Sequence, residues 1–290
     1  MKLSTQISYI VKVFGFEEGV KLLHRAGYDA LDLSLFTMKL DDCEYVGDGW
    51  SECVESRRSF CDKEGIVFNQ AHAPFAFRWE DPKVYEEIAQ PRVLRSIEIA
   101  AMMGVDVIVV HPLHNAEYKG HEAEMHELNL KYYRSLIPYC REYGIKVAVE
   151  NMWQTDRKRR CISDDVASRA ADLAAYIDEL DSEWIVACLD LGHCGLVGEE
   201  AQDAIRILGH DRLRALHVHD NNYREDNHTL PGMGMMDWDA ICSALHDIGY
   251  AGEFTFEADA FLHRFGKDFL ETAVRFMVQN GRYLIGKIGL

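Results

Sequence analysis

Eight short aliphatic runs alternate along the chain with longer amphipathic stretches, and this alternation constrains the fold more than any other feature. The runs predict strands at 3–8, 30–34, 66–73, 107–111, 146–150, 185–190, 213–219 and 252–257. The stretches between them predict helices at 16–25, 52–63, 82–103, 122–143, 165–180, 199–208, 238–246 and 267–282. Strands that are apolar almost throughout, such as 107–110, are typical of a parallel sheet covered on both faces.

Eight consecutive βα units are the number that closes a (β/α)8 barrel, or TIM barrel, and a chain of 290 residues has room for one. A doubly wound open sheet is the alternative, but no GxGxxG glycine pattern follows the first predicted strand. Neither a low-complexity linker nor a shift in composition divides the chain. We therefore predict an α/β fold with a single TIM barrel domain over residues 1–290.

The chain carries 48 Asp and Glu residues against 31 Lys and Arg residues, which gives a net charge of −17. This charge repels polyanions, so nucleic acid is not expected as a partner. The short basic stretch 157–160 is a local exception, and it is either a solvated loop or a contact for an anionic group. No apolar run reaches the roughly 20 residues that span a bilayer, and the N-terminal stretch lacks the features of a signal peptide. We expect a cytoplasmic protein without membrane contact, whose eight cysteines stay reduced.

Side chains that bind metals collect at the carboxyl ends of the predicted strands. They are His72, His111, Glu150, Asp190, His193, His217, His219 and Glu257. In a TIM barrel these ends meet at one mouth, where a ring of carboxylates would repel itself. Neither Lys nor Arg lies at these ends, so a divalent metal ion would compensate the charge; protonated carboxylates in a dry pocket are the alternative. Two glutamates, one aspartate and one histidine form an oxygen-rich set that suits Mn²⁺ or Mg²⁺ better than a closed zinc site does.

Several motifs follow one another along these strand ends. They are Val149-Glu150-Asn151, Leu189-Asp190-Leu191-Gly192-His193, His217-Val218-His219-Asp220-Asn221, Asp226-Asn227-His228 and Pro231-Gly232-Met233-Gly234. In this order, they make nearly the whole chain resemble the xylose-isomerase-like TIM barrel superfamily. That superfamily contains sugar and sugar-phosphate isomerases and epimerases, among them D-tagatose 3-epimerase-like enzymes, and is related to endonuclease IV.

The resemblance implies two sets of ligands and a divalent metal cofactor. The single-metal set of the epimerases falls on Glu150, Asp190, His217 and Glu257. The three-zinc set of endonuclease IV adds the positions that would otherwise contact substrate, which are His72, His111, His193, Asp226 and His228. His219 falls on a variable position, and Met233 replaces the glutamate of a Gly-Glu-Gly stretch in many relatives, which removes a polar contact. Mn²⁺ is the expected ion, with Mg²⁺, Co²⁺ or Zn²⁺ as alternatives.

The function that these residues favour is a metal-dependent isomerase or epimerase with a small carbohydrate substrate, either a sugar or a sugar phosphate. Glu150 and Glu257 would transfer protons next to a carbonyl, through an enediolate. The candidates for an apolar wall against the sugar carbons, which otherwise pack as ordinary loop residues, are Trp153, Phe75, Phe77 and Trp238.

Other functions stay open. An endonuclease IV-like AP endonuclease or phosphodiesterase would use all nine ligand types, but the acidic charge opposes it. Related barrels act on cyclitols or glycosides, and a barrel that only binds its ligand is a further alternative. Helices on the barrel exterior would also allow a homo-oligomer.

Overall fold

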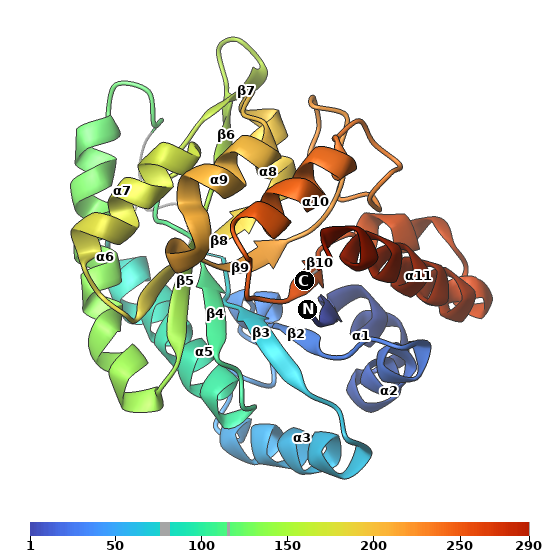
Figure 1. Cartoon of the computed structure of the whole chain (residues 1–290). Coiled ribbons are helices and arrows are strands. Elements are labelled where there is room, and N and C mark those ends of the chain that lie inside the picture. Colours follow the sequence, from blue (N-terminus) through green and yellow to red (C-terminus); the bar gives the residue numbers. More distant parts are fainter. Residues whose placement is uncertain (76–81, 115–116, 290) are drawn as a thin grey trace.

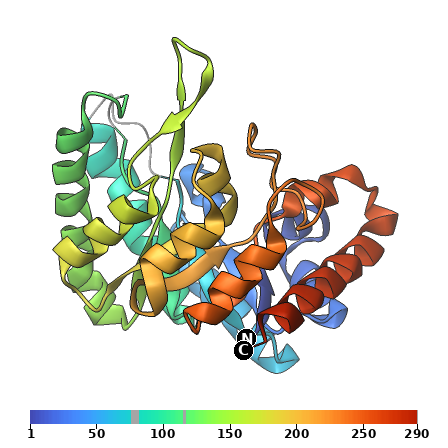
Figure 2. The same ribbon diagram turned by 45° about the horizontal axis from the view of Figure 1, so that its top comes forward.

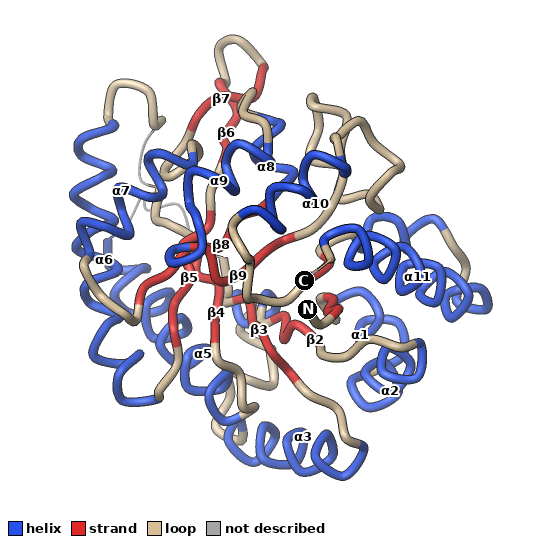
Figure 3. The backbone as a smooth tube through the Cα atoms, in the orientation of Figure 1, coloured by secondary structure: helices blue, strands red, loops and turns tan. Residues whose placement is uncertain are grey.

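The structure, a computed structural model, describes residues 1–75, 82–114 and 117–289. All eight predicted strands are present: β1 Leu3–Thr5, β2 Leu31–Ser34, β3 Phe68–His72, β4 Val107–Val110, β5 Lys146–Glu150, β8 Ile185–Asp190, β9 Leu213–His217 and β10 Phe254–Phe256. They lie together at the centre of the molecule (Figure 3). The strands β2, β3, β4, β5, β8 and β9 form one parallel sheet in this order, and β1 pairs in parallel with β10.

Single bridges connect the six-stranded sheet to the β1–β10 pair. One joins Gln6 to Asp32, and the other joins Val218 to Phe256. The expected barrel is therefore observed as a curled six-stranded sheet and a two-stranded pair, and no continuous ladder joins all eight strands in the described part of the chain. With three residues each, β1 and β10 are too short for full ladders on both sides. Because all these contacts are parallel, the carboxyl ends of the strands lie at one edge.

Helices surround the strands (Figure 1). They are α1 Ser8–Phe14, α2 Phe16–Ala26, α3 Trp50–Glu64, α4 Pro82–Val84, α5 Gln90–Met102, α6 Glu122–Tyr143, α7 Ala170–Leu180, α8 Leu191–Leu196, α9 Ala201–Arg212, α10 Trp238–Asp247 and α11 Leu270–Ile288. Short turns of 3-10 helix are η1 Phe36–Lys39, η3 Asp259–Arg264 and η4 Lys267–Phe269, and η2 Tyr85–Ala89 is a π-helical turn. In the described part of the chain, none of the helices has the length and apolarity that a bilayer crossing needs.

Several segments differ from the prediction, among them the short helices α1 and α8, which are not among the predicted helices. An antiparallel hairpin, β6 Trp153–Asp156 and β7 Cys161–Asp164, stands clear of the sheet, and the basic stretch 157–160 forms its tip (Figure 2). Residues 165–169 form a loop instead of the start of a helix, since Ala167 has a positive φ of 56° that a helix cannot contain. The predicted helix 82–103 is interrupted by η2 just ahead of Pro91, which has no backbone N–H to donate.

The two faces of the sheet bury different side chains. Residues such as Ile108, Val147 and Leu189 belong to the large apolar core that the helices cover. A separate cluster of mostly small side chains fills the opposite, inner face: Val109, Ala148, Val186, Cys188 and Ala215. Side chains two residues apart on a strand point to the same face. Residues two positions beyond this inner cluster, at the strand ends, therefore also lie on the inner face.

Candidate metal centre

Strand alternation brings the candidate ligands to the inner face. Glu150, Asp190 and His217 end β5, β8 and β9, and each lies two residues beyond a member of the inner cluster. In the sheet, Glu150 pairs with Cys188 and Asp190 pairs with His217. Glu257 follows β10 directly. Four residues far apart in the sequence thus arrive at one place.

These four residues form the first cluster (Glu150, Asp190, His217 and Glu257). Each offers one ligand atom, and the four atoms lie within 4.8 Å of one another. His217 Nδ1 lies 2.8 Å from Glu150 Oε1 and 3.3 Å from Glu257 Oε2. All four side chains are buried. The ligand set that the epimerase resemblance implies is therefore assembled in the folded chain.

Two histidines at the ends of β3 and β4 adjoin Glu150. The Nε2 atoms of His72 and His111 lie 3.1 Å apart. Glu150 Oε2 lies 2.8 Å from His111 Nε2 and 3.5 Å from His72 Nε2. This oxygen is buried and has no aligned hydrogen-bond partner among the described residues. Because buried polar atoms normally have partners, two converging imidazole nitrogens and such an oxygen fit either a metal ion or a substrate hydroxyl.

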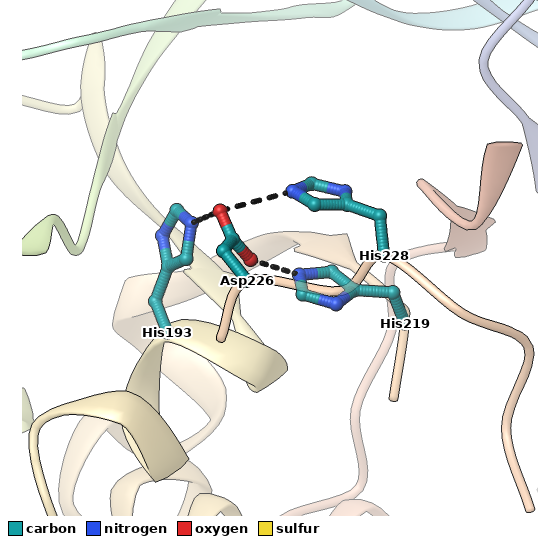
Figure 4. A group of neighbouring side chains, drawn as sticks. All are labelled: His193, His219, Asp226 and His228. Atoms are coloured by element: carbon teal, nitrogen blue, oxygen red, sulfur yellow. Dashed lines mark ion pairs between the residues drawn. The ribbon is translucent and has the colours of Figure 1, made fainter. Parts of the chain in front are cut away.

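A second cluster (His193, His219, Asp226 and His228) also offers four ligand atoms within 4.8 Å (Figure 4). Asp226 Oδ2 lies 3.2 Å from His228 Nε2 and 3.5 Å from His193 Nε2. His219 Nε2 lies 3.8 Å from Asp226 Oδ1, and the His219 ring stacks on that of His228 at 4.0 Å. Imidazoles and a carboxylate are the donor types that bind zinc.

His219 connects the two clusters, although it falls on a variable position of the resemblance. Its Nε2 atom lies 2.9 and 3.1 Å from the two carboxylate oxygens of Asp190, and its side chain is fully buried. Spacing is the signal that identifies it, because His219 lies two residues after His217 and such residues point the same way along an extended chain. Gly192 makes the space, since a Cβ atom there would lie 2.1 Å from the His219 ring.

Backbone groups fix the direction of two rings. His193 Nδ1 lies 2.8 Å from the carbonyl oxygen of Asn151, and His228 Nδ1 lies 2.7 Å from that of Glu257. The Nε2 atoms of both rings therefore point into the second cluster. The Asn151 side chain also accepts a hydrogen bond from the Asp190 N–H and donates one to the Asp190 carbonyl oxygen. Contacts of this kind orient metal-binding residues in proteins.

Charges in the first cluster compensate one another. Burial raises the pKa of Glu150, but His217 and His111 outweigh burial and hold that pKa well below its usual range. Burial lowers the pKa of His217, but Glu257 and Glu150 outweigh it and hold that pKa well above its usual value. Without a metal ion, the carboxylates of Glu257 and Glu150 therefore favour the positively charged imidazolium form of His217.

The same balance holds in the second cluster. Burial lowers the pKa of His193, but Asp190 and Asp226 outweigh it and raise that pKa to about 10. Protonated histidines are thus a source of positive charge that strand-end composition alone does not reveal. A metal ion at either cluster would replace these protons, because only the neutral imidazole is a ligand.

The candidate wall residues border the clusters at two points. Trp153 Nε1 donates a hydrogen bond to Asp226 Oδ2 at 3.3 Å, at the edge of the second cluster. The Phe75 ring lies 5.1 Å from that of His111, and the residue is 37% exposed. Phe77 lies outside the described residues.

The loop after β9 is held by Asp220. This carboxylate accepts hydrogen bonds from the backbone N–H groups of Gly232 and Met236 and from Trp238 Nε1. Trp238, expected as a wall residue, is buried and holds this loop instead. Met233 is 50% exposed in the same loop.

Comparison with known proteins identifies a matching family and several similar proteins. The model of the xylose isomerase-like TIM barrel family matches residues 20–276. An uncharacterised protein of Sinorhizobium fredii is 27% identical over 164 residues, which are 56% of this chain and 50% of that protein, so the match spans half of the relative's length. A probable endonuclease 4 of Heliobacterium modesticaldum is 28% identical over 198 residues, 63% of this chain and 67% of that protein. The solved structure of D-psicose 3-epimerase with D-tagatose from Clostridium cellulolyticum H10 has a TM-score of 0.75 at 15% identity, and the match covers 98% of this chain and 99% of that one.

Proposed function

The chain belongs to the xylose isomerase-like TIM barrel family, and we propose that it is a divalent-metal-dependent isomerase or epimerase of a carbohydrate. Its reaction would be proton transfer next to a carbonyl, through an enediolate, in a single-domain barrel. The observation that carries the proposal is the first cluster, in which Glu150 and Glu257 approach the same nitrogen of His217.

Glu150 and Glu257 would exchange protons with the substrate from different sides. Glu150 ends β5, in the middle of the six-stranded sheet, whereas Glu257 follows β10, which pairs with β1. Epimerisation at C3 of a ketose takes a proton from one face of the carbon and returns one to the other face, which requires two proton-transferring groups. A 1,2-isomerisation would use the same two groups with the substrate placed differently.

Other residues would bind and orient the substrate. A Mn²⁺ ion held by the first cluster would supply Lewis-acid polarisation of the carbonyl. His72, His111 and His193 would hold substrate hydroxyls with their ring nitrogens. Trp153 and Phe75 would cover the apolar side of the sugar. Burial of the first cluster would keep water from the reacting carbon.

An activity screen of free and phosphorylated ketoses with Mn²⁺ in deuterated water tests the reaction. The product should gain solvent deuterium at the carbon that changes configuration or carries the shifted carbonyl. Glu150→Gln and Glu257→Gln should each lower turnover by roughly 10²-fold or more, the usual effect of losing a general acid or base. Each change also removes a ligand, so metal occupancy must be measured. A fully metallated Glu150→Gln protein nearly as fast as the parent would refute the two-carboxylate mechanism.

Elemental analysis tests the metal itself. The purified protein should hold about one divalent ion per chain, and Glu257→Gln should lose most of it. Glu253→Gln is a matched control, since Glu253 precedes β10 at the opposite end of the same strand and pairs with Lys2. If the protein holds no metal after loading with Mn²⁺ and desalting, the proposal is refuted.

A second candidate is a metal-dependent AP endonuclease or phosphodiesterase, which the second cluster favours because it adds a further set of imidazole and carboxylate donors. That enzyme would hold about three ions per chain, zinc foremost, and would cleave DNA at abasic sites. The net charge of −17 opposes contact with DNA, so we prefer the carbohydrate enzyme. Three ions per chain together with cleavage of abasic DNA would reverse this preference.

A further inference from the structure

A cavity of about 470 Å³, here the side cavity, is bordered by residues of α1, η1, α3 and η3. Its wall includes Ser34 at the end of β2 and Asp259, which lies two residues beyond Glu257. Phe36 belongs to the same wall, and its ring also lies 4.6 Å from that of His72. The side cavity therefore adjoins the metal centre. Its volume falls within the range of small-molecule sites, about 300–1,000 Å³.

Apart from the exposed Lys12, the charged groups of the side cavity are paired with one another. The Arg57 guanidinium donates hydrogen bonds to the Tyr45 hydroxyl and to the Glu44 carboxylate. Asp259 Oδ2 lies 3.6 Å from His263 Nε2. A phosphate or carboxylate in this space would meet two carboxylates, while the guanidinium that suits it is already engaged. The wall therefore favours an uncharged ligand.

Aromatic rings and hydroxyl groups also line the side cavity, beside aliphatic side chains. Tyr9 and Phe36 are half-buried, and the Tyr9 ring packs against that of His263 at 4.2 Å. The side chains of Ser8 and Thr37 line the same space. A pyranose ring has an apolar face, a rim of hydroxyls and no charge. It matches a wall in which aromatic rings stand beside hydroxyl groups that can fix its orientation.

We propose that the side cavity binds the non-reacting sugar ring of a glycoside whose carbonyl-bearing unit reacts at the first cluster. This inference rests on the proposed function for the reacting end of the substrate and on the side cavity for the other end. Contacts to the second ring persist in the transition state, so they raise kcat/KM. A ketose that carries a second sugar is then a better substrate than the free ketose.

Isomaltulose, a fructose that carries a glucosyl unit on O6, and D-fructose are the test pair for the Mn²⁺-loaded protein. We expect a kcat/KM for isomaltulose higher by about tenfold, the effect of one or two aromatic contacts. Tyr9→Ala should remove this advantage, so that the ratio of the two kcat/KM values falls to about one. Tyr9→Phe keeps the ring and should keep the advantage. Tyr283→Ala, at an exposed tyrosine of α11, is the control that should change neither value.

A binding measurement separates this inference from the proposed function. Methyl α-D-glucopyranoside has no carbonyl to react, so titration calorimetry with it measures binding without turnover, and Tyr9→Ala assigns that binding to the side cavity. Binding that Tyr9→Ala abolishes would support the inference even if no ketose were turned over, a result that would refute the proposed function. Equal kcat/KM for the two sugars without glucoside binding would overturn the inference. A stronger preference for fructose 6-phosphate would also overturn it and would assign the cavity, with Lys12 in its wall, to an anion.

Discussion

Alanine in place of Gly192 should destabilise the protein, although alanine is the better helix former. Gly192 lies in α8, and a Cβ atom there would lie 2.1 Å from His219 Cε1 and 2.7 Å from both ring nitrogens. The His219 ring has little freedom to move away. It is fully buried, it contacts Asp190 at 2.9 Å, and it stacks on His228.

The size of the effect follows from opposing contributions. At an unhindered helix position, replacing glycine by alanine stabilises by roughly 0.5–1 kcal/mol. Forcing a methyl group into a packed interior costs roughly 1–3 kcal/mol. Displacing the His219 ring also weakens its hydrogen bond to the Asp190 carboxylate, worth about 1.5–3 kcal/mol. We therefore expect Gly192→Ala to lower the free energy of unfolding by about 2–4 kcal/mol.

Urea unfolding followed by circular dichroism measures this free energy. Gly286→Ala in α11 is the matched control, since among the described residues no neighbouring atom lies within 4 Å of the position that its Cβ would take. That change should stabilise slightly, so the two variants should differ in sign. Metal content of Gly192→Ala should fall as well, because Asp190 loses its orienting partner.

Equal or greater stability of Gly192→Ala would refute the packing argument. A double-mutant cycle with His219→Ala locates the cause, because residues in contact show a coupling energy. If the methyl group clashes with the His219 ring, alanine at position 192 should lower the free energy of unfolding much less in the His219→Ala background, which lacks the ring. An unchanged cost in that background would place the strain elsewhere in α8.

Three further predictions concern the metal and the loop after β9. Against the effect of burial, neighbouring carboxylates hold the pKa of His217 well above its usual value, so its proton must leave when a metal ion binds. Mn²⁺ affinity should therefore rise about tenfold per pH unit from roughly pH 6 to 8, and a flat profile by titration calorimetry would contradict this. His111→Ala should leave about one ion per chain and raise the Michaelis constant about tenfold, whereas loss of further ions in elemental analysis would indicate a multinuclear site. Trp238→Phe removes the hydrogen bond from Nε1 to Asp220 and should lower the free energy of urea unfolding by about 1–2 kcal/mol; no change would mean that the bond contributes nothing net.

The first cluster could be predicted from the sequence because it depends on regularities that are local. Glu150, Asp190 and His217 each end a β-rich run, and strand alternation with parallel order is enough to place them at one edge. Glu257 follows a run of the same kind. Their separations along the chain do not matter, since the fold repeats one unit and each unit delivers its last residues to the same place.

Other features depend on contacts that have no local signal. The hairpin β6–β7 is half-exposed, so burial imposes no apolar alternation on it, and its two strands are defined only by pairing with each other. The position of His219 depends on the absence of a side chain at Gly192, a residue that precedes it by 27 positions. The ladder around β1 and β10 is incomplete because the chain turns into α1 soon after Thr5. The apolar residues at positions 7 and 10 do not reveal this early turn in the sequence.

Asp190 is the point at which the two clusters meet, and its contacts bear on how the second cluster acts. It belongs to the first cluster, yet both of its oxygens contact His219 Nε2 at 2.9 and 3.1 Å. An imidazole N–H directed at a carboxylate orients that carboxylate toward a metal ion. With Nε2 so engaged, the other ring nitrogen of His219 remains buried without a partner among the described residues.

His219 is thus better placed to orient Asp190 than to act as a fourth ligand beside Asp226. The second cluster then has three possible ligands, which are His193, Asp226 and His228, and an open position. An open site can accept a substrate hydroxyl, whereas a structural zinc site is closed by four protein ligands. The contacts of His219 therefore favour a second cluster that binds substrate, next to a first cluster that holds the metal ion.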